Sequence, residues 1–378
     1  MGTIVVNRLW QTILVLLFAA LVSFSLIRYV GDPVNNMVGQ AASLADRLEM
    51  RQQLGLDDPV VFQFARFVKS AAVGDLGISY RFGLRVSALL MERLPATLEL
   101  SVCAMMIAVA LGVPLGVWTA LHRRSLLSQV LLAASLIGVA LPTFLIGIVL
   151  ILVFSVWLGW LPSFGRGSVV DLGGGWTSGL FTASGIKALI LPSLTLGLFQ
   201  MTLIMRLVRA EMMEVLRTDF IKFARARGLT NATVNYDHAL RNTLVPVITI
   251  IGLQFGNIFA FSIIVETVFQ WPGLGLLVIQ AIQFADVPLL AAYLVLVALC
   301  FALINLAVDF CLFTELLVYY NAYLEVGGLG GVMSLRLRLV VYKPFGFLNQ
   351  YKQVKFNCCK NCWFVIQSFN IIISILIL

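Results

Sequence analysis

Long apolar stretches recur along most of this chain and dominate its hydrophobic pattern. Six of them can be read, at residues 9–28, 96–121, 127–158, 188–208, 243–265 and 287–313. Each is long enough to cross the roughly 30 Å hydrocarbon core of a bilayer as a helix. Backbone groups in lipid must be satisfied within the segment, and the alternating pattern of barrel strands is absent from the sequence. The pattern therefore predicts an all-α polytopic membrane protein with six transmembrane helices.

The composition also indicates that lipid is the solvent. Apolar residues make up 60% of the 378 residues and charged residues only 12%, whereas a soluble domain carries about 25% charged residues. An ordinary soluble domain and a disordered chain are therefore excluded. The net charge of +8 comes mainly from residues 326–378, which hold six basic residues and no acidic one. Because the basic residues do not gather on a soluble face, we expect no nucleic-acid partner.

The distribution of basic residues in the connections predicts the orientation of the chain in the membrane. Connection 206–242 carries seven basic residues, whereas connection 266–286 carries none. We therefore expect both termini on the cytoplasmic side. The predicted organisation is an N-terminus with the first span at 1–28, an extracytoplasmic cap at 29–95, a five-helix core at 96–313 that contains the cytoplasmic loop 206–242, and an atypical tail at 314–378.

Within these segments, two prolines mark predicted helix ends. Residues 86–94 have the pattern of an amphipathic helix, which Pro95 is expected to stop. Pro246 is expected to open the fifth span, and segment 206–216 to continue as a helix out of the fourth. Segment 29–95 is a candidate surface for receiving another protein, or it stabilises the outer face.

The chemistry that would let this chain work alone is missing from the sequence. It contains neither a Walker-type phosphate loop nor an H-E-x-x-H pair, and its C-x-x-C, at Cys359 and Cys362, has no second ligand pair. We therefore predict no catalytic, cofactor or metal site. The span interiors hold almost no ionisable residue, apart from Glu99 one turn into the second span. This scarcity argues against an ion-coupled carrier, which usually needs charges at mid-membrane.

Loop 206–242 is predicted to contain two short helices joined at a glycine. Asp219 can cap a first helix that runs to Arg227, and Gly228 can supply the left-handed residue that ends it. Thr230 or Asn231 can cap the second helix. Small alanines alternate with arginines before the glycine, which would permit the close approach of another protein. The alternative is a solvated basic loop of the kind common on the cytoplasmic side.

The loop residues resemble a known family. The stretches Asp219-Phe-Ile-Lys-Phe-Ala-Arg-Ala-Arg-Gly-Leu229 and His238-Ala-Leu-Arg-Asn-Thr-Leu-Val-Pro246 are similar to the signature loop of ABC-importer permeases. The resemblance is to the dipeptide/oligopeptide/nickel branch, and to the first of its two paired permease subunits. Four further stretches agree: Gly74-Asp-Leu-Gly-Ile-Ser-Tyr80, Glu92-Arg-Leu-Pro-Ala-Thr-Leu-Glu-Leu100, Leu158-Gly-Trp-Leu-Pro162 and Glu266-Thr-Val-Phe-Gln-Trp-Pro-Gly-Leu-Gly275.

The likeness covers roughly residues 1–310 and has two departures. The general importer loop begins Glu-Ala-Ala six residues before its glycine, and here those positions are Lys222, Phe223 and Ala224. This branch commonly departs there, so a glutamate-mediated contact is not expected. From about Cys311 onward the resemblance ends.

The resemblance implies a type I ABC importer permease fold with both termini inside. It implies a permease subunit of an ATP-driven importer in the bacterial cytoplasmic (inner) membrane, forming half of the translocation path for di- or oligopeptides or a similar small solute. Such a chain is not an enzyme and holds no cofactor, since ATP and Mg bind to partner subunits. The implied partners are a second homologous permease, two ABC ATPases, an extracytoplasmic substrate-binding protein and the lipid bilayer. A secondary carrier acting without an ATPase is the main alternative, followed by a membrane enzyme or assembly factor.

Two candidate sites follow from the resemblance. The ATPase-docking coupling loop would comprise Asp219, Phe220, Phe223, Ala224, Arg225, Ala226, Arg227, Gly228 and Leu229. The candidates for an outer gate are Glu266, Phe269, Trp271, Pro272 and Gly273. These gate candidates lie in a short re-entrant segment, 266–286, whose turn could instead contact the binding protein or serve as a structural plug.

Overall fold

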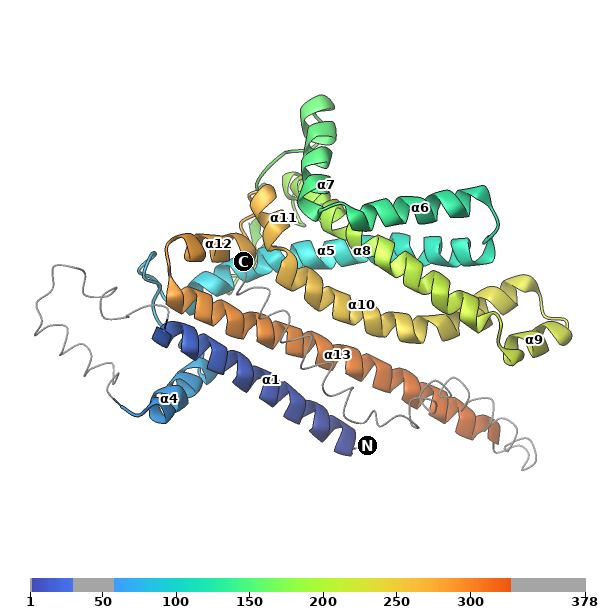
Figure 1. The fold of residues 1–378 in the computed structure, drawn as a ribbon, viewed down its shortest axis with the longest axis horizontal. Coiled ribbons are helices and arrows are strands. Elements are labelled where there is room, and N and C mark those ends of the chain that lie inside the picture. Colours follow the sequence, from blue (N-terminus) through green and yellow to red (C-terminus); the bar gives the residue numbers. More distant parts are fainter. Residues whose placement is uncertain (1, 30–57, 328–378) are drawn as a thin grey trace, which may run out of the picture. The chain divides into compact units, whose positions relative to one another are not determined.

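The computed structural model describes residues 2–29 and 58–327, which are mainly helical (Figure 1). The helices are α1 (Gly2–Tyr29), α4 (Val60–Ala72), α5 (Val86–Leu121), α6 (Leu126–Ala140), α7 (Thr143–Leu150), α8 (Ala183–Val215), α9 (Asp219–Ala226), α10 (Arg241–Phe261), α11 (Ile263–Val268), α12 (Leu274–Gln283) and α13 (Val287–Gly327). Two π-helical segments, η1 (Ile151–Trp157) and η2 (Thr233–Leu240), extend α7 and precede α10. Strands β1 (Val170–Asp171) and β2 (Thr177–Ser178) form a small antiparallel hairpin.

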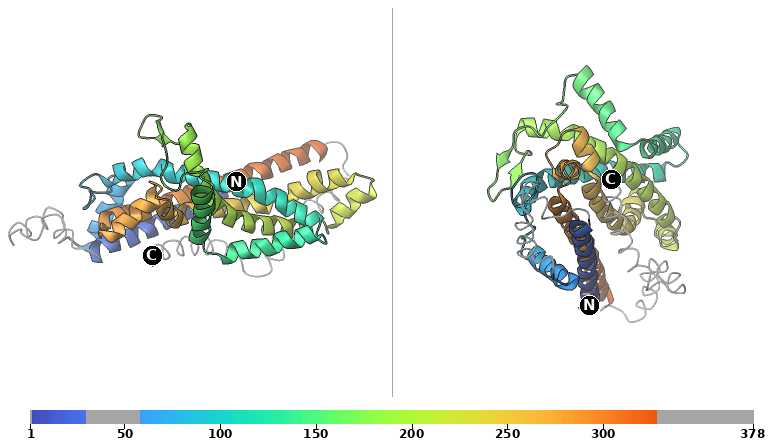
Figure 2. Two further views of the ribbon diagram at one scale, coloured as in Figure 1. Left: turned by 90° about the horizontal axis from the view of Figure 1, so that it is seen from above. Right: turned by 60° about the vertical axis from the view of Figure 1, so that its left-hand side comes forward.

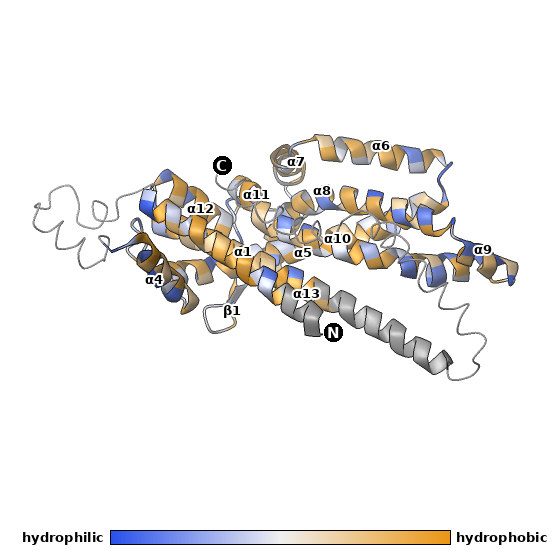
Figure 3. Ribbon diagram, turned by 60° about the horizontal axis from the view of Figure 1, so that its bottom comes forward, coloured by the Kyte–Doolittle hydropathy of each residue, from blue (hydrophilic) through white to orange (hydrophobic). Residues whose placement is uncertain are grey.

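The described helices are long and apolar enough for a polytopic membrane protein. Five of them qualify as membrane spans: Leu9–Tyr29, Val86–Leu121, Ala183–Val215, Thr233–Val268 and Val287–Val308. A sixth span results if α6 and the α7–η1 helix are counted together. Figure 3 shows hydrophobic residues over most of the described turns of the long helices, and hydrophilic residues at α9. The predicted all-α membrane architecture is confirmed.

Two prolines behave differently from the sequence prediction, and a third lies at a break in a span. The expected stop at Pro95 is wrong, because α5 runs without a break from Val86 to Leu121. Pro246 likewise lies inside α10 and does not open it. The predicted span 127–158 is bent between α6 and α7, where Pro142 precedes the first residue of α7. A proline removes one backbone donor, and its surroundings decide whether a membrane helix continues or breaks there.

The chain divides into two compact units. The first comprises Met1–Ala108, Ile137–Gln200 and Phe255–Ala302, and the second Val109–Leu136, Met201–Gln254 and Leu303–Leu378. Of the predicted cap at 29–95, residues 30–57 lie outside the described part of the chain, and so do residues 328–378 of the predicted tail. Helix α13 continues past the predicted boundary at 313 to Gly327.

In the first unit, α1 and α4 lie side by side (Figure 2). Phe24 packs edge-on against Phe64 with ring centroids 5.6 Å apart, and Arg28 donates a hydrogen bond of 3.0 Å to Gln63. The Ser23 hydroxyl donates to the carbonyl of Ala291 in α13 at 2.9 Å. The first two contacts hold α1 against α4, and the third joins α1 to α13 within this unit.

In the second unit, α5 and α8 approach each other through two glycines. A Cβ added to Gly112 would lie 3.1 Å from Ile204, and one added to Gly116 would lie 2.6 Å from Val208. Small residues four apart let two membrane helices pack at close range, which is how such helices gain van der Waals contact in lipid. In the same unit α8 is also joined to α6, since the Arg209 guanidinium donates to the Ser128 hydroxyl at 3.0 Å.

Candidate functional site

Loop 206–242, which contains the candidate docking residues 219–229, is called the coupling loop below. It lies in the second unit and begins as a continuation of α8. Helix α8 continues to Val215, which confirms the helix predicted for segment 206–216 almost to its end. A tight turn follows, in which the Thr218 hydroxyl donates to the Val215 carbonyl at 2.6 Å. The Thr243 hydroxyl donates to the carbonyl of Ala239 at 2.9 Å and lies 3.5 Å from the sulfur of Met212, so the end of α8 also contacts the start of α10.

Helix α9 starts one residue earlier than predicted. Asp219 is the first residue of the helix, so the prediction that it caps the helix is wrong; Thr218 precedes the helix and forms no side-chain cap hydrogen bond. The Asp219 carboxylate pairs with the Lys222 ammonium at 3.0 Å. An acidic residue in the first turn still favours the helix, because the positive end of the helix dipole lies there.

Gly228 ends α9 in the way that the sequence predicted. Its φ is +78°, and its amide donates to the carbonyl of Arg225 at 2.9 Å. The amide of Leu229 donates to the carbonyl of Ala224 at 3.4 Å. These two bonds form a Schellman motif, which satisfies carbonyls at the helix end and requires a left-handed residue. A Cβ at Gly228 would meet no atom within 4 Å, so the requirement for glycine is purely conformational.

The second helix of the loop is capped by Thr230, which decides between the two predicted caps. The amide of Thr233 donates to the Thr230 hydroxyl at 3.3 Å. The helix then continues through η2 into α10. Thus the loop is two helices joined by a glycine-centred turn, as the sequence predicted.

The exposed face of α9 is aromatic and basic. Ile221 and Ala224 are buried, and α9 packs against η2. Phe223 is 65% exposed, with the Arg227 guanidinium 5.8 Å from its ring. Of the two alanines expected to permit close approach, only Ala226 is exposed. The exposed surface of α9 therefore includes Phe223, one of the three positions at which this chain departs from the Glu-Ala-Ala pattern.

The second candidate site lies in the first unit, where residues 269–273 form a tight turn between α11 and α12. We call this segment the outer turn. Glu266 in α11 is fully buried beside it. One carboxylate oxygen accepts hydrogen bonds from the hydroxyls of Thr97 at 2.7 Å and Ser262 at 3.0 Å. The other accepts from the backbone amides of Gly275 at 2.7 Å and Leu276 at 3.2 Å.

The outer turn is also bonded directly to α5. The Thr97 hydroxyl accepts from the amide of Leu274 at 2.8 Å, and the Trp271 indole donates to the carbonyl of Ala96 at 3.0 Å. A Cβ at Gly273 would lie 2.5 Å from the Thr97 hydroxyl oxygen and would also collide with the Glu266 carboxylate. This position therefore needs glycine because other atoms approach it closely.

The remaining gate candidates complete the turn. Phe269 is buried, and its carbonyl accepts a hydrogen bond of 2.9 Å from the amide of Gly165. Pro272 is half-buried. The structure thus brings all five gate candidates together in one compact element.

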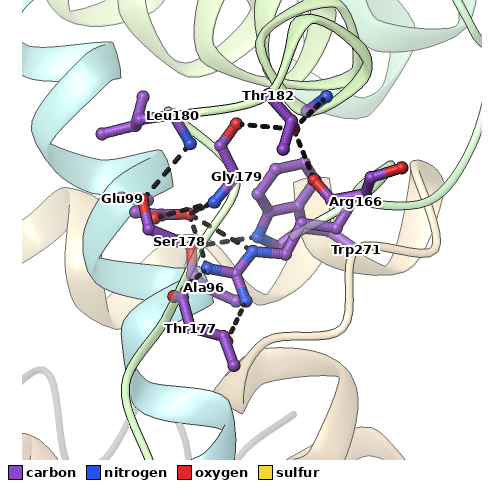
Figure 4. A network of polar contacts seen from close by, with 11 residues as sticks. Ala96, Glu99, Arg166, Thr177, Ser178, Gly179, Leu180, Thr182 and Trp271 are labelled. Atoms are coloured by element: carbon purple, nitrogen blue, oxygen red, sulfur yellow. Dashed lines mark hydrogen bonds and ion pairs between the residues drawn. The ribbon is translucent and has the colours of Figure 1, made fainter. Parts of the chain in front are cut away.

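Beside the outer turn lies a buried ion pair that the sequence did not predict (Figure 4). The guanidinium of Arg166 donates to the carboxylate of Glu99 at 2.6 Å, and both side chains are only 7% exposed. Arg166 also donates to the hydroxyl and carbonyl of Thr177, and the amide of Gly179 donates to Glu99 at 3.2 Å. The sequence did contain one signal for this pair. Glu99 is a single acidic residue within an apolar span, and such residues almost always have a partner.

A third buried carboxylate holds the segment before α5 in place. Asp286, which precedes α13, accepts hydrogen bonds from the Ser79 hydroxyl and from the amides of Tyr80 at 3.2 Å and Arg81 at 3.3 Å. The Arg81 guanidinium lies 4.0 Å from the centre of the Phe284 ring. Sequence reasoning missed this contact because its partners are about two hundred residues apart. Among residues 2–29 and 58–327, no group of three metal-ligating side chains occurs, and Cys359 and Cys362 lie outside that range.

Comparison with known proteins identifies the family of this chain. Residues 112–312 match the model of the binding-protein-dependent transport system inner membrane component, and residues 1–101 match the model of its N-terminal region. The match ends close to Cys311, where the resemblance read from the sequence also ends.

The most similar relatives include three peptide permease proteins. The dipeptide transport system permease protein DppB of Alkalihalophilus pseudofirmus is 37% identical over 315 residues, which cover 80% of this chain and 95% of the relative. DppB of Escherichia coli K12 is 36% identical over 322 residues (81% and 95%). The di/tripeptide permease protein DppB of Pseudomonas aeruginosa is 38% identical over 323 residues (82% and 96%).

Among solved structures, the methionine ABC transporter MetNI in an inward-facing conformation is similar at 19% identity, covering 60% of this chain and 95% of that chain with a TM-score of 0.49. The family matches together span most of the chain, and they consist of transport components and not of enzymes. The chain therefore belongs to the family of binding-protein-dependent transport system inner membrane components: it is a multi-pass inner-membrane permease subunit of an ABC importer, which works with ATPase subunits and a substrate-binding protein.

Proposed function

We propose that this chain imports di- or oligopeptides as one of two paired permease subunits, each forming half of the translocation path. The observation that carries the proposal is the similarity to three peptide permeases at 36–38% identity, over at least 95% of each relative's length. The relatives' cargo is the best guide to the cargo of this chain, with chemically similar small solutes as the range to be screened.

The coupling loop is proposed to dock on one of two ABC ATPases. ATP and Mg would bind to these ATPases and not to this chain. The exposed Phe223 would enter a pocket of the partner, with Arg225, Arg227 and Leu229 around it. Aromatic and arginine side chains carry much of the binding energy at protein interfaces. The Schellman turn at Gly228 would present this face in one defined orientation.

The movement of the ATPases would pass from α9 into α8. Helix α8 is continuous from Ala183 to Val215, so a displacement at its end cannot be absorbed by a flexible linker. Because Gly112 and Gly116 of α5 pack closely against Ile204 and Val208, α5 would move together with this part of α8. The loop would occupy different positions with and without bound nucleotide on the ATPases, and the spans would move with it. Coupling requires such a difference in contacts between two states.

On the opposite side of the membrane, we propose that Glu266, Phe269, Trp271, Pro272 and Gly273 form an outer gate. In the proposed arrangement the cap at 29–95 and the outer turn face the extracytoplasmic binding protein, and the five-helix core at 96–313 encloses half of the path. The gate proposal is supported by the compactness of the outer turn and by its position between two apolar helices.

The proposal is tested by reconstituting this chain in proteoliposomes with its second permease, its ATPases and its binding protein. We expect uptake of a radiolabelled dipeptide with ATP and none with a non-hydrolysable ATP analogue. Vesicles that hold only this chain, under an imposed proton or sodium gradient, are the control for a secondary carrier. Accumulation in those vesicles would replace the importer proposal with the carrier.

A further inference from the structure

Glu266 is a buried carboxylate whose four hydrogen-bond donors are all neutral. They come from three separate elements: Thr97 from α5, Ser262 from the turn before α11, and the amides of Gly275 and Leu276 from the first turn of α12. The first amides of a helix have no partner inside the helix, so they need an acceptor from outside it. Glu266 supplies that acceptor for α12 from nine and ten residues upstream.

The two carboxylate oxygens meet different demands. The oxygen that faces α12 accepts from two backbone amides, which can only donate. The other oxygen faces the hydroxyls of Thr97 and Ser262, which can either donate or accept. Position 266 therefore requires an acceptor on the α12 side, whereas on the hydroxyl side either a donor or an acceptor is satisfied. A glutamine amide, with its oxygen toward α12 and its nitrogen toward the hydroxyls, meets both demands without a negative charge.

The same elements are joined by contacts that do not involve Glu266. Thr97 accepts from the amide of Leu274, and Trp271 donates to the carbonyl of Ala96. The space beside Gly273 is too small for a Cβ. The outer turn and the first residue of α12 are thus hydrogen-bonded at two places to one turn of α5. Both bonds lie in the interior, since Thr97, Trp271 and Leu274 are all buried.

We infer that Glu266 and Thr97 are positioning residues that fasten the outer turn and α12 to residues 96–97 of α5. Both act as hydrogen-bonding groups, and the negative charge of Glu266 is not required for transport. The outer turn then moves only together with this part of α5. The inference rests on the proposed function only where peptide uptake is used as a readout. It predicts that an isosteric neutral residue at 266 works and that an apolar one does not.

The test compares Glu266→Gln, Glu266→Leu and Thr97→Val in the complete importer. Glu266→Gln should keep the rate of peptide uptake and its KM within about twofold of wild type. Glu266→Leu removes the acceptor of the Gly275 and Leu276 amides in the first turn of α12 and should lower the maximal rate at least tenfold, with a lower Tm of the purified complex. Thr97→Val removes the hydrogen bonds of this hydroxyl to Glu266 and from the amide of Leu274 but leaves the two α12 amides bonded to Glu266, so it should fall between the two.

Matched controls exist in the same unit. Thr195 is buried like Thr97, but its hydroxyl donates only to the carbonyl of Leu191 in its own helix, so Thr195→Val should leave uptake and Tm unchanged. Gly179→Ala is the control for Gly273→Ala, because a Cβ at Gly179 has its nearest neighbour at 3.7 Å. Gly273→Ala should lower the Tm, and Gly179→Ala should not.

Two results would overturn the inference. The first is a Glu266→Gln importer that assembles with wild-type Tm but transports no better than Glu266→Leu, since the charge would then be essential. The second is a Glu266→Leu importer with wild-type uptake and Tm. If the wild-type importer takes up no peptide, the proposed cargo fails, and the order of Tm values still tests the inference: wild type and Glu266→Gln highest, Thr97→Val lower and Glu266→Leu lowest.

Discussion

The outer turn and the coupling loop are stabilised in opposite ways. Around the outer turn, buried carboxylates accept hydrogen bonds from residues 67, 169 and 207 positions away in the sequence. In the coupling loop, the turn-forming bonds join residues three to five positions apart, and most of the named side chains are exposed. A site that must keep its shape is built from buried, long-range bonds, whereas a site that must meet a partner is formed locally and leaves its side chains free to bind. Substitutions should therefore cost stability in the first region and association in the second.

The largest effect is expected at the ion pair beside the outer turn. Arg166→Met leaves the Glu99 carboxylate buried without its cation, which should cost about 3–5 kcal/mol of folding stability. Thermal unfolding of the purified complex in detergent measures this. Arg66→Met is the matched control, because Arg66 pairs with Asp58 at the surface and should lose less than about 1 kcal/mol. Equal losses in the two variants would contradict the contrast between the buried and exposed pairs.

Gly228→Pro should have the next largest effect, and on transport. Proline cannot adopt the φ of +78° and cannot donate to the Arg225 carbonyl, so the turn that ends α9 is lost. We expect uptake to be abolished while membrane insertion, followed by immunoblot of the membrane fraction, stays at the wild-type level. Gly228→Ala, with open space for its Cβ, should cost only about 1–2 kcal/mol and keep partial uptake. Full uptake by the proline variant would refute the role of the loop.

Phe223→Ala should weaken ATPase association without changing the fold. The ring is 65% exposed in the described chain, so its removal uncovers little of the protein's own core. As the central aromatic residue of a docking face it should contribute about 2 kcal/mol, or roughly thirtyfold in Kd, to association. Co-purification and surface plasmon resonance with the ATPases would measure this. Tyr236→Ala removes another exposed aromatic side chain of the loop outside the proposed face, and an equal loss there would argue against specific docking by Phe223.

The smallest effect is expected at the ion pair of α9. Lys222→Ala removes the contact with Asp219, but both side chains are largely exposed. An exposed pair three residues apart on a helix contributes less than about 0.5 kcal/mol. Tm, ATPase association and uptake should therefore all stay close to wild type. A clear loss of association alone would show that Lys222 itself belongs to the docking face.

Much of the coupling loop was predictable from the sequence. The two helices, the left-handed residue at Gly228 and one of the two caps proposed for the second helix, Thr230, were all confirmed. The prediction for Asp219 was wrong by one residue, which is the usual precision at a helix end. Each of these features depends on residues within one or two turns of one another, so the local sequence contains the information.

The apolar pattern of the sequence by itself determined that this protein is a bundle of membrane helices, because the length and hydrophobicity of a span are properties of one segment. Its motifs determined the family. Only the tertiary structure decided that α5 continues through Pro95, that Arg166 pairs with Glu99, and that Glu266 caps α12 and binds Thr97. Such contacts join segments far apart in the chain, and a buried polar group can be satisfied by any of several partners until packing brings one of them within hydrogen-bonding distance.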